Sequence, residues 1–332
     1  MKTRSIYAAV TAGLALLGGQ GAQAQDCVLD IAPGAVIAGT SSSDFLVIEQ
    51  GCQINAAGTL EQPINFTAFE AVTGSVESSA RGLWGGLVIN GFAPINDCPE
   101  GAQGGTAECT KEGEANSGLF GGDDPNDSSG VLTFVVVSYA GSNVDPENQL
   151  NGIAFQGVGS GTTVDYVQVH NNLDDGIEFF GGTVNASHVV LTGNADDSLD
   201  WTDGWQGAVQ FAYLEQQNGG DNLIEADNRE GDENAQPRSA PYISNMSAYG
   251  IAGENGLRLR RGTGLFLTNS IVTDSTSCLQ IEGVSVDLLG SELTVGGTSF
   301  GCPDTTTGDS SATVDAYLDS ADEVSTDGGQ VS

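Results

Sequence analysis

Two acidic phrases are the stretches of this sequence best suited to chemistry. DDGIEF begins at Asp174 and DDSLDW begins at Asp196, an offset of 22 residues. Weaker copies of the same phrase begin at residues 150, 221, 254 and 276. Within each copy apolar and polar residues alternate, which is typical of a short β-strand with one side facing a core.

If the copies stack, acids that are far apart in the sequence form a column. Neighbouring strands lie about 4.8 Å apart, and two carboxylates at that spacing repel by about 3 kcal/mol at an effective dielectric of 20. A cation would relieve this repulsion, and Ca²⁺ is the natural one because it takes six to eight oxygens in loose geometry. We therefore expect Ca²⁺ as a cofactor, with these ligands: Asp174, Asp175, Glu178, Asp196, Asp197, Asp200, Asp203, Glu225 and Asp227. The alternative is that these residues are solvated corners, because Asp, Asn and Gly favour turns for backbone reasons alone.

The elements that position these acids repeat with a period in the low twenties, which indicates a solenoid. Between the copies lie further β-rich runs, and none of them has helical periodicity. These runs are 131–137, 164–169, 188–191, 209–213 and 265–272. The pattern predicts an all-β fold, a right-handed, single-stranded parallel β-helix in which stacked coils bury one another's apolar face.

The segments before and after the repeats indicate where the β-helix domain begins and ends. Residues 1–24 have the basic start, short apolar run and small-residue cleavage site of a signal peptide. The β-helix domain is expected over 25–302, with polar loop excursions at 96–130 and 227–241. The acidic segment 303–332 contains Val314, Tyr317, Leu318 and Val324, which could form one face of a short helix on the last coil. No stretch is long enough for a transmembrane helix. Because of the signal peptide, we expect a secreted protein, extracellular, periplasmic or at the cell surface.

The charge balance excludes one class of partner. The 332-residue chain has 9 basic and 44 acidic residues and a formal net charge of −35. Such a chain repels phosphate backbones, so nucleic-acid binding is not expected. It attracts divalent cations and stays soluble through self-repulsion.

An even number of cysteines in an exported chain suggests disulfides. The separations of 25 residues (Cys27 to Cys52) and 24 residues (Cys278 to Cys302) each match about one coil. Cys98 and Cys109 share one Gly-rich loop. We predict these three bridges, with other pairings or free thiols as the alternative.

Four phrases resemble a family of secreted bacterial β-helix proteins with a pectate-lyase-like fold, mostly hypothetical exported proteins or lipoproteins. They are GLWGGLVINGFAPIN (82–96), FGGDDPNDSSGVLTFVVVSYAG (120–141), LNGIAFQGVGSGTTVDYVQV (150–169) and DDGIEFFGGTVNASHVV (174–190). The resemblance covers about 45–285. It implies the fold, and it implies no activity, because fold does not determine function.

Two functions remain open from the sequence. The first is a secreted, calcium-binding, disulfide-stapled β-helix with a structural or adhesive role, as a surface, matrix or filament component or in glycan binding. Its partners would be further copies stacked end to end, or extracellular polysaccharide. Trp205, expected in a corner, would be the platform for a sugar ring.

The second is a calcium-dependent polysaccharide lyase or glycosidase. Arg258, from the basic cluster 258–261, would be the catalytic base beside the acids in a lyase. The alternative for Arg258 is a salt bridge that ends the column of acids. A glycosidase would use a pair of carboxylates, but acids are too common here to single out one pair.

Overall fold

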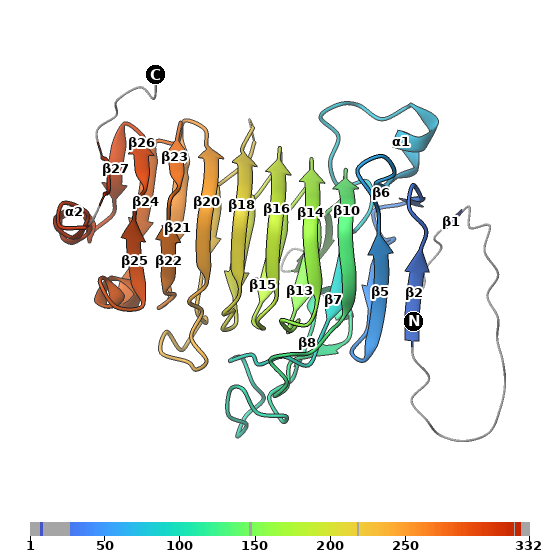
Figure 1. The fold of residues 1–332 in the computed structure, drawn as a ribbon, viewed down its shortest axis with the longest axis horizontal. Coiled ribbons are helices and arrows are strands. Elements are labelled where there is room, and N and C mark those ends of the chain that lie inside the picture. The colour runs from blue at the N-terminus through green and yellow to red at the C-terminus, as the bar shows by residue number, and fades with distance from the viewer. Residues whose placement is uncertain (1–6, 9–26, 146–147, 218, 322, 327–332) are drawn as a thin grey trace.

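A computed structural model describes residues 7–8, 27–145, 148–217, 219–321 and 323–326. The strands lie side by side in coil after coil along one axis (Figure 1). Apart from a few short antiparallel pairs, neighbouring strands in the described residues run parallel. The prediction of an all-β parallel β-helix is confirmed.

The larger sheet has fourteen strands within the described residues. They are β1 (Tyr7–Ala8), β2 (Cys27–Ile31), β3 (Val36–Gly39), β5 (Cys52–Ala57), β6 (Ile64–Ala68), β10 (Gly130–Ser138), β14 (Thr163–His170), β16 (Asn185–Thr192), β18 (Ala208–Glu215), β20 (Tyr242–Tyr249), β22 (Leu265–Thr268), β23 (Ile271–Thr273), β25 (Leu293–Gly296) and β26 (Ser299–Gly301). The predicted run 265–272 is therefore two strands, because Asn269 between them has a φ of 46° and turns the chain.

The second sheet has nine short strands in the same part of the chain. They are β4 (Leu46–Ile48), β7 (Leu87–Asn90), β13 (Ile153–Gln156), β15 (Ile177–Phe180), β17 (Leu199–Thr202), β19 (Ile224–Ala226), β21 (Asn255–Leu259), β24 (Ser277–Ile281) and β27 (Asp304–Thr307). Two hairpins leave the coils, β8 (Lys111–Glu112) with β9 (Leu119–Phe120) and β11 (Ser142–Asp145) with β12 (Asn148–Leu150).

The core lies between the two sheets and is filled by the inward residue of every second position. In β15, Ile177 and Phe179 are buried, whereas Glu178 between them is partly exposed. Phe155 stacks on Phe179 with ring centroids 5.2 Å apart, one coil above the other. Because each coil presents the same pattern, stacking buries a continuous apolar column.

The long strands of the larger sheet bend at the same place in successive coils. Phe134, Tyr166, His188 and Phe211 each have a φ between 50° and 59°, which re-aims the side chain outward. Their rings stack at centroid distances of 4.5, 4.2 and 4.9 Å. This outer ladder of rings covers ring faces that would otherwise contact water.

Disulfides join the end coils and one loop. The bridges are Cys27–Cys52, Cys98–Cys109 and Cys278–Cys302, so the predicted pairing is confirmed. The first joins β2 to its parallel neighbour β5, and the third joins β24 to the segment after β26.

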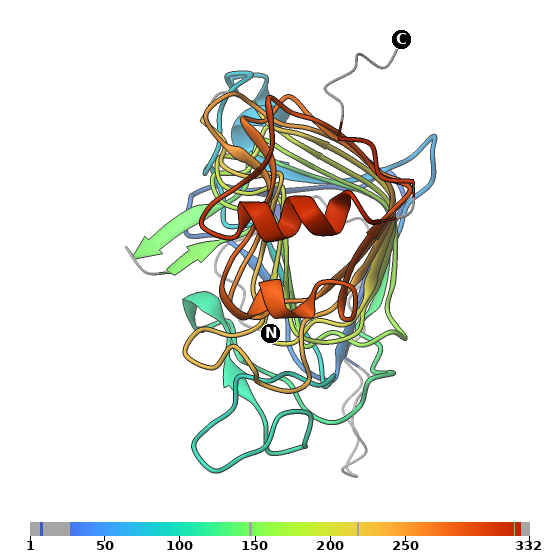
Figure 2. The same ribbon diagram turned by 90° about the vertical axis from the view of Figure 1, so that its left-hand side faces the viewer.

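The C-terminal end is covered by helix α2 (Ser311–Leu318), which lies across the last coil (Figure 2). Val314 and Leu318 of this helix are buried, and Tyr317 and Val324 pack beside them. The predicted capping helix is therefore present, although Val324 lies beyond its end. The other short helices are α1 (Phe69–Thr73), the 3₁₀ turn Glu114–Asn116 and the 3₁₀ helix Gly283–Leu288.

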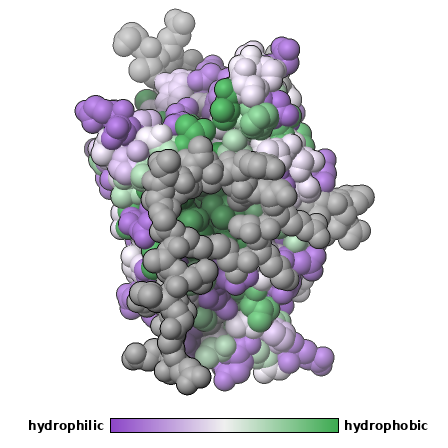
Figure 3. All heavy atoms as spheres, turned by 90° about the vertical axis from the view of Figure 1, so that its right-hand side faces the viewer, coloured by the Kyte–Doolittle hydropathy of each residue, from purple (hydrophilic) through white to green (hydrophobic). Residues whose placement is uncertain are grey.

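In the view onto the N-terminal end, hydrophobic residues are visible at the centre, and hydrophilic residues lie mostly toward the edges (Figure 3). The predicted signal peptide, 1–24, lies outside the described residues except for the two residues of β1. In the described part of the chain, no helix has the length and apolar character needed to cross a membrane.

Candidate metal site

In four successive coils, from β15 to β21, the second sheet places one charged side chain in register on its outer face. Glu178 of β15 is the Cα partner of Asp200 of β17, and Asp200 is the partner of Glu225 of β19. Arg258 of β21 follows Glu225. The predicted column of acids therefore exists in these strands. It forms because side chains alternate along each short strand, so that Glu178, Asp200 and Glu225 point away from the core.

A second set of acids lies in the turns that precede these strands. Asp175 accepts a hydrogen bond from the backbone N–H of Asp197 at 2.9 Å, one coil further on. Asp197 in turn accepts from the backbone N–H of Asn222 at 2.7 Å and from its side-chain amide at 2.9 Å. These hydrogen bonds hold successive turns in register. They use only part of the hydrogen-bonding capacity of the Asp175 and Asp197 carboxylates.

Turn and strand acids converge in three overlapping groups whose carboxylate oxygens lie within 4.8 Å of one another. The groups are Asp174, Asp175 and Asp196; then Asp175, Asp197 and Asp200; then Asp196, Asp197 and Asp221. Five of the predicted ligands are therefore brought together. Asp221 completes the third group from the same ladder position as Asp174 and Asp196.

The acids at the centre of the column form no salt bridge with a side-chain cation among the described residues, although the Arg260 charge acts on Asp196 from a distance and partly offsets the rise in its pKa that burial causes. None of the ion pairs there involves Asp174, Asp175, Glu178, Asp196, Asp197 or Asp200. Burial, together with the Asp196 charge, raises the pKa of Asp174 to about 7. Burial also raises the pKa of Asp200, and Glu178 and Asp197 raise it further. Shared protons or a bound cation would each relieve the repulsion among these carboxylates.

The flanks of the column differ, because there the acids are paired. Lys111 lies 2.7 Å from Asp97 and 3.0 Å from Asp203. At the other flank, Arg260 and Arg261 pair with Asp227, and Arg260 also contacts Glu225. Of the predicted ligands, Asp203, Glu225 and Asp227 are thus held by side-chain cations, and they lie outside the three groups. Glu178 also lies outside the three groups.

Arg258 lies between two carboxylates. Its guanidinium is 3.2 Å from Glu225 and 3.1 Å from Glu282. This arrangement matches the alternative interpretation of Arg258 as a salt bridge that ends the column.

The loop 96–130 contributes groups that the repeat pattern does not reveal. Glu114, in its 3₁₀ turn, lies near Glu178, and Asn151 donates to both carboxylates at 3.4 and 2.6 Å. Burial and the Asp174 charge raise the pKa of Glu114 to about 8. Glu114 and Lys111 lie in a non-repeating excursion, so no spacing argument could find them.

Trp205 does not provide a sugar platform, and that expectation is wrong. Its side chain is fully buried. The indole ring stacks on Phe179 with centroids 4.0 Å apart, and Nε1 donates to the Val184 carbonyl at 3.1 Å. The corner that carries Trp205 turns its side chain into the core, where a sugar has no access.

The chemistry of the donor set fits a hard divalent cation. The three groups offer only carboxylate oxygens, the ligands that Ca²⁺ prefers, whereas Zn²⁺ sites use His or Cys. Oxygens on opposite sides of a Ca²⁺ ion lie about 4.6–5.2 Å apart. A spacing of 4.8 Å or less lets the oxygens of one group share an ion.

The fold and the site define a disulfide-stapled parallel β-helix with an acidic column on its second sheet. The model of the family described as "pectate-lyase like beta helix domain" matches residues 14–327, and the chain belongs to this family. No curated protein and no solved structure gives a significant match.

Proposed function

We propose that this is an exported structural or adhesive β-helix protein whose acidic column binds Ca²⁺. The observation that carries the proposal is the group formed by Asp175, Asp197 and Asp200. Their oxygens lie within 4.8 Å of one another, and no side-chain cation in the described residues pairs with them. A bound cation would remove the repulsion between coils and stabilise the middle of the stack.

Two further features support a structural role outside the cell. Three disulfides fit an oxidising compartment, since cytosolic proteins rarely keep them. The central acids accept backbone hydrogen bonds from the next coil, so they hold the stack together as well as offering ligands.

No observation favours the lyase or glycosidase over this proposal. Arg258 is held by two carboxylates, and Trp205 is buried. End-to-end stacking is not part of the proposal either, because α2 covers the C-terminal end (Figure 2). Strand pairing at that end would require the helix to leave.

The test is calorimetric titration of Ca²⁺ and of Mg²⁺ into chelator-treated protein. We expect Ca²⁺ to bind and Mg²⁺ to bind more weakly, because Mg²⁺ gives up its waters reluctantly. Asp175→Asn keeps an oxygen that can accept the Asp197 N–H but removes the charge from two of the three groups. It should weaken Ca²⁺ binding at least about tenfold, since a removed charged ligand is typically worth more than about 1.4 kcal/mol.

The matched control is Asp309→Asn, an exposed acid outside the column. It should bind Ca²⁺ like the unaltered protein. Equal weakening by both substitutions would mean that only the net charge matters, and absence of any Ca²⁺ heat would remove the proposal.

A further inference from the structure

Among the described residues, Arg81 is the one lysine or arginine that forms no ion pair with a carboxylate. Beyond the first 24 residues the chain has seven basic residues against 44 acidic ones. Six of the seven form ion pairs with carboxylates, namely Lys111, Arg229, Arg238, Arg258, Arg260 and Arg261. Arg81 instead donates from Nε to the backbone carbonyl of Gly193 at 2.7 Å.

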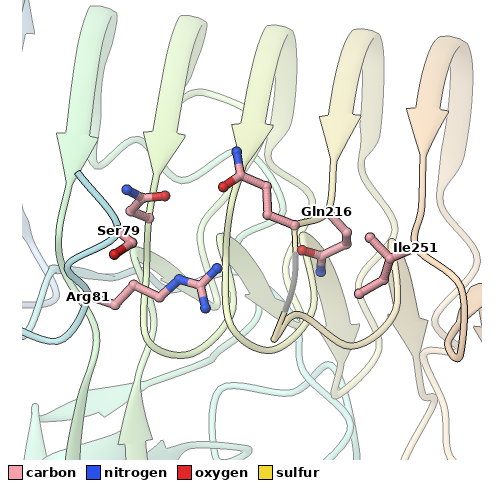
Figure 4. Close-up of a pocket in the computed structure, with 6 residues that line it drawn as sticks. Ser79, Arg81, Gln216 and Ile251 are labelled. Carbon is pink, nitrogen blue, oxygen red and sulfur yellow. The ribbon is translucent and has the colours of Figure 1, made fainter.

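The side chain of Arg81 lines a groove at the corner where the strands of the larger sheet end (Figure 4). The groove has a volume of about 520 Å³, within the size range of small-molecule sites. Its walls are formed by Ser79, Arg81, Asn171, Gln216, Gln217 and Ile251. None of these described wall residues is an acid, although acids are abundant elsewhere in the chain.

The segment that carries Arg81 is fixed to the coils on both sides of this residue. Gly82 donates its backbone N–H to Ala140 at 2.9 Å, and the Asn171 side chain donates to the Ser78 carbonyl at 2.6 Å. Because Nε is engaged by Gly193, the guanidinium has a defined orientation. Its remaining N–H groups form the planar fork that recognises carboxylates.

The polar side chains around the Arg81 guanidinium differ in whether they already form hydrogen bonds within the protein. The Gln216 amide donates to the carbonyls of Asp196 and Asn222 at 2.6 and 2.8 Å, so this side chain is a fixed wall. Ser79 and Gln217 are exposed, and no hydrogen bond within the described residues occupies their side chains. A hydroxyl and an amide beside a guanidinium suit a ligand that carries hydroxyl groups next to its anionic group.

We propose that this groove binds a small, singly charged hydroxycarboxylate through Arg81, at a site separate from the acidic column. The carboxylate of the ligand would form the ion pair that Arg81 lacks among the described residues. The hydroxyl groups of the ligand would form hydrogen bonds with Ser79 and Gln217. A single charge is required, because a net charge of −35 repels a polyanion. Burial lowers the pKa of Arg81 from its ordinary value, as expected for a guanidinium without a nearby anion.

The experiment is a titration of chelator-treated full-length protein with gluconate, with glucose as the neutral probe and sulfate as the tetrahedral anion. Binding is measured by calorimetry and by the NMR shift of the Arg81 Nε–H signal. We expect gluconate to bind and shift that signal, glucose to do neither, and sulfate to bind more weakly because its double negative charge is repelled by a protein of net charge −35.

Two substitutions and a control complete the test. Arg81→Gln should weaken gluconate binding at least about tenfold, and Arg81→Lys should weaken it less, because the charge stays and the fork is lost. Arg229→Gln is the matched control, a loop arginine already paired with Asp97, and it should bind gluconate normally. If Arg81→Gln does not fold, two measurements still test the proposal. They are the shift of the Arg81 Nε–H signal in the unaltered protein and the gluconate affinity of Arg81→Lys.

The proposal is overturned if gluconate leaves the Arg81 signal in place. It is also overturned if glucose binds as well as gluconate, or if Arg81→Lys and Arg229→Gln weaken binding equally. These measurements do not depend on Ca²⁺ binding. The proposal for the acidic column and the proposal for the groove are therefore tested independently.

Discussion

Glu178 and Asp200 are Cα partners in β15 and β17, and no side-chain cation in the described residues pairs with either. Two carboxylates 22 residues apart in the sequence thus lie one above the other on the same face. Such a pair is costly when both groups are charged and partly buried. The column therefore responds to protons, to cations and to the removal of single charges.

Asp200→Asn should separate repulsion from cation binding. Without Ca²⁺ the substitution removes a charge from between Glu178 and Glu225, so the free energy of unfolding should rise by about 1 kcal/mol. With Ca²⁺ the variant should gain less stability than the unaltered protein, because one ligand is lost. Urea denaturation with chelator and with Ca²⁺ measures both effects, and a cation-free variant less stable than the unaltered protein would contradict the prediction.

The stability of the cation-free protein should fall as the pH rises from about 4 to about 8. Burial raises the pKa of Asp174 to about 7 and that of Glu114 to about 8, whereas in the unfolded chain such groups titrate near 4. Between these values the folded protein keeps protons that the unfolded chain has lost, so deprotonation favours unfolding. Above about pH 8 this contribution should be constant.

Ca²⁺ should reverse this dependence, since it binds the deprotonated groups. Its stabilising effect should be small at pH 5 and large at pH 8, and its binding at pH 7 should release protons. Denaturation at pH 5, 6.5 and 8 with and without Ca²⁺, and calorimetry in buffers of different ionisation enthalpy, measure these effects. A cation-free protein that becomes more stable from pH 5 to pH 8 would disagree with the raised pKa values.

Lys111→Met should loosen the loop 96–130 from the coils. The substitution leaves Asp203, whose side chain is only 5% exposed, without its cation. The cost should be about 1–3 kcal/mol, because an uncompensated buried charge remains while Lys111 itself is partly exposed. The double variant with Asp203→Asn should recover part of that loss, and additive effects in this mutant cycle would mean that the pair does not interact.

Replacing Cys278 and Cys302 together by alanine should destabilise the C-terminal end. A bridge across 24 residues is worth about 3 kcal/mol in the chain-entropy model. Hydrogen exchange should increase first in β24, β27 and α2 and remain slow in β15 and β17. Uniform acceleration through all coils would show that the end does not open separately.

The sequence by itself determined the repeating coils of the β-helix and which residues of neighbouring coils contact one another. Its period placed Glu178, Asp200, Glu225 and Arg258 on one ladder and paired Cys27 with Cys52, because a regular coil converts a constant spacing into contact between neighbours. The same local alternation predicted which residues of each strand face the core. These relations depend only on residues one coil apart.

The tertiary structure alone decided that Asp203 is neutralised and that Glu178 has a second acid beside it. Lys111 and Glu114 reach the column from an excursion that has no period, so no spacing could place them beside Asp203 and Glu178. Trp205 turned inward because the direction of a corner side chain depends on the packing of the neighbouring coils. The groove at Arg81 likewise forms where a non-repeating segment crosses several turns, and contacts of this kind are set by the folded arrangement of distant segments.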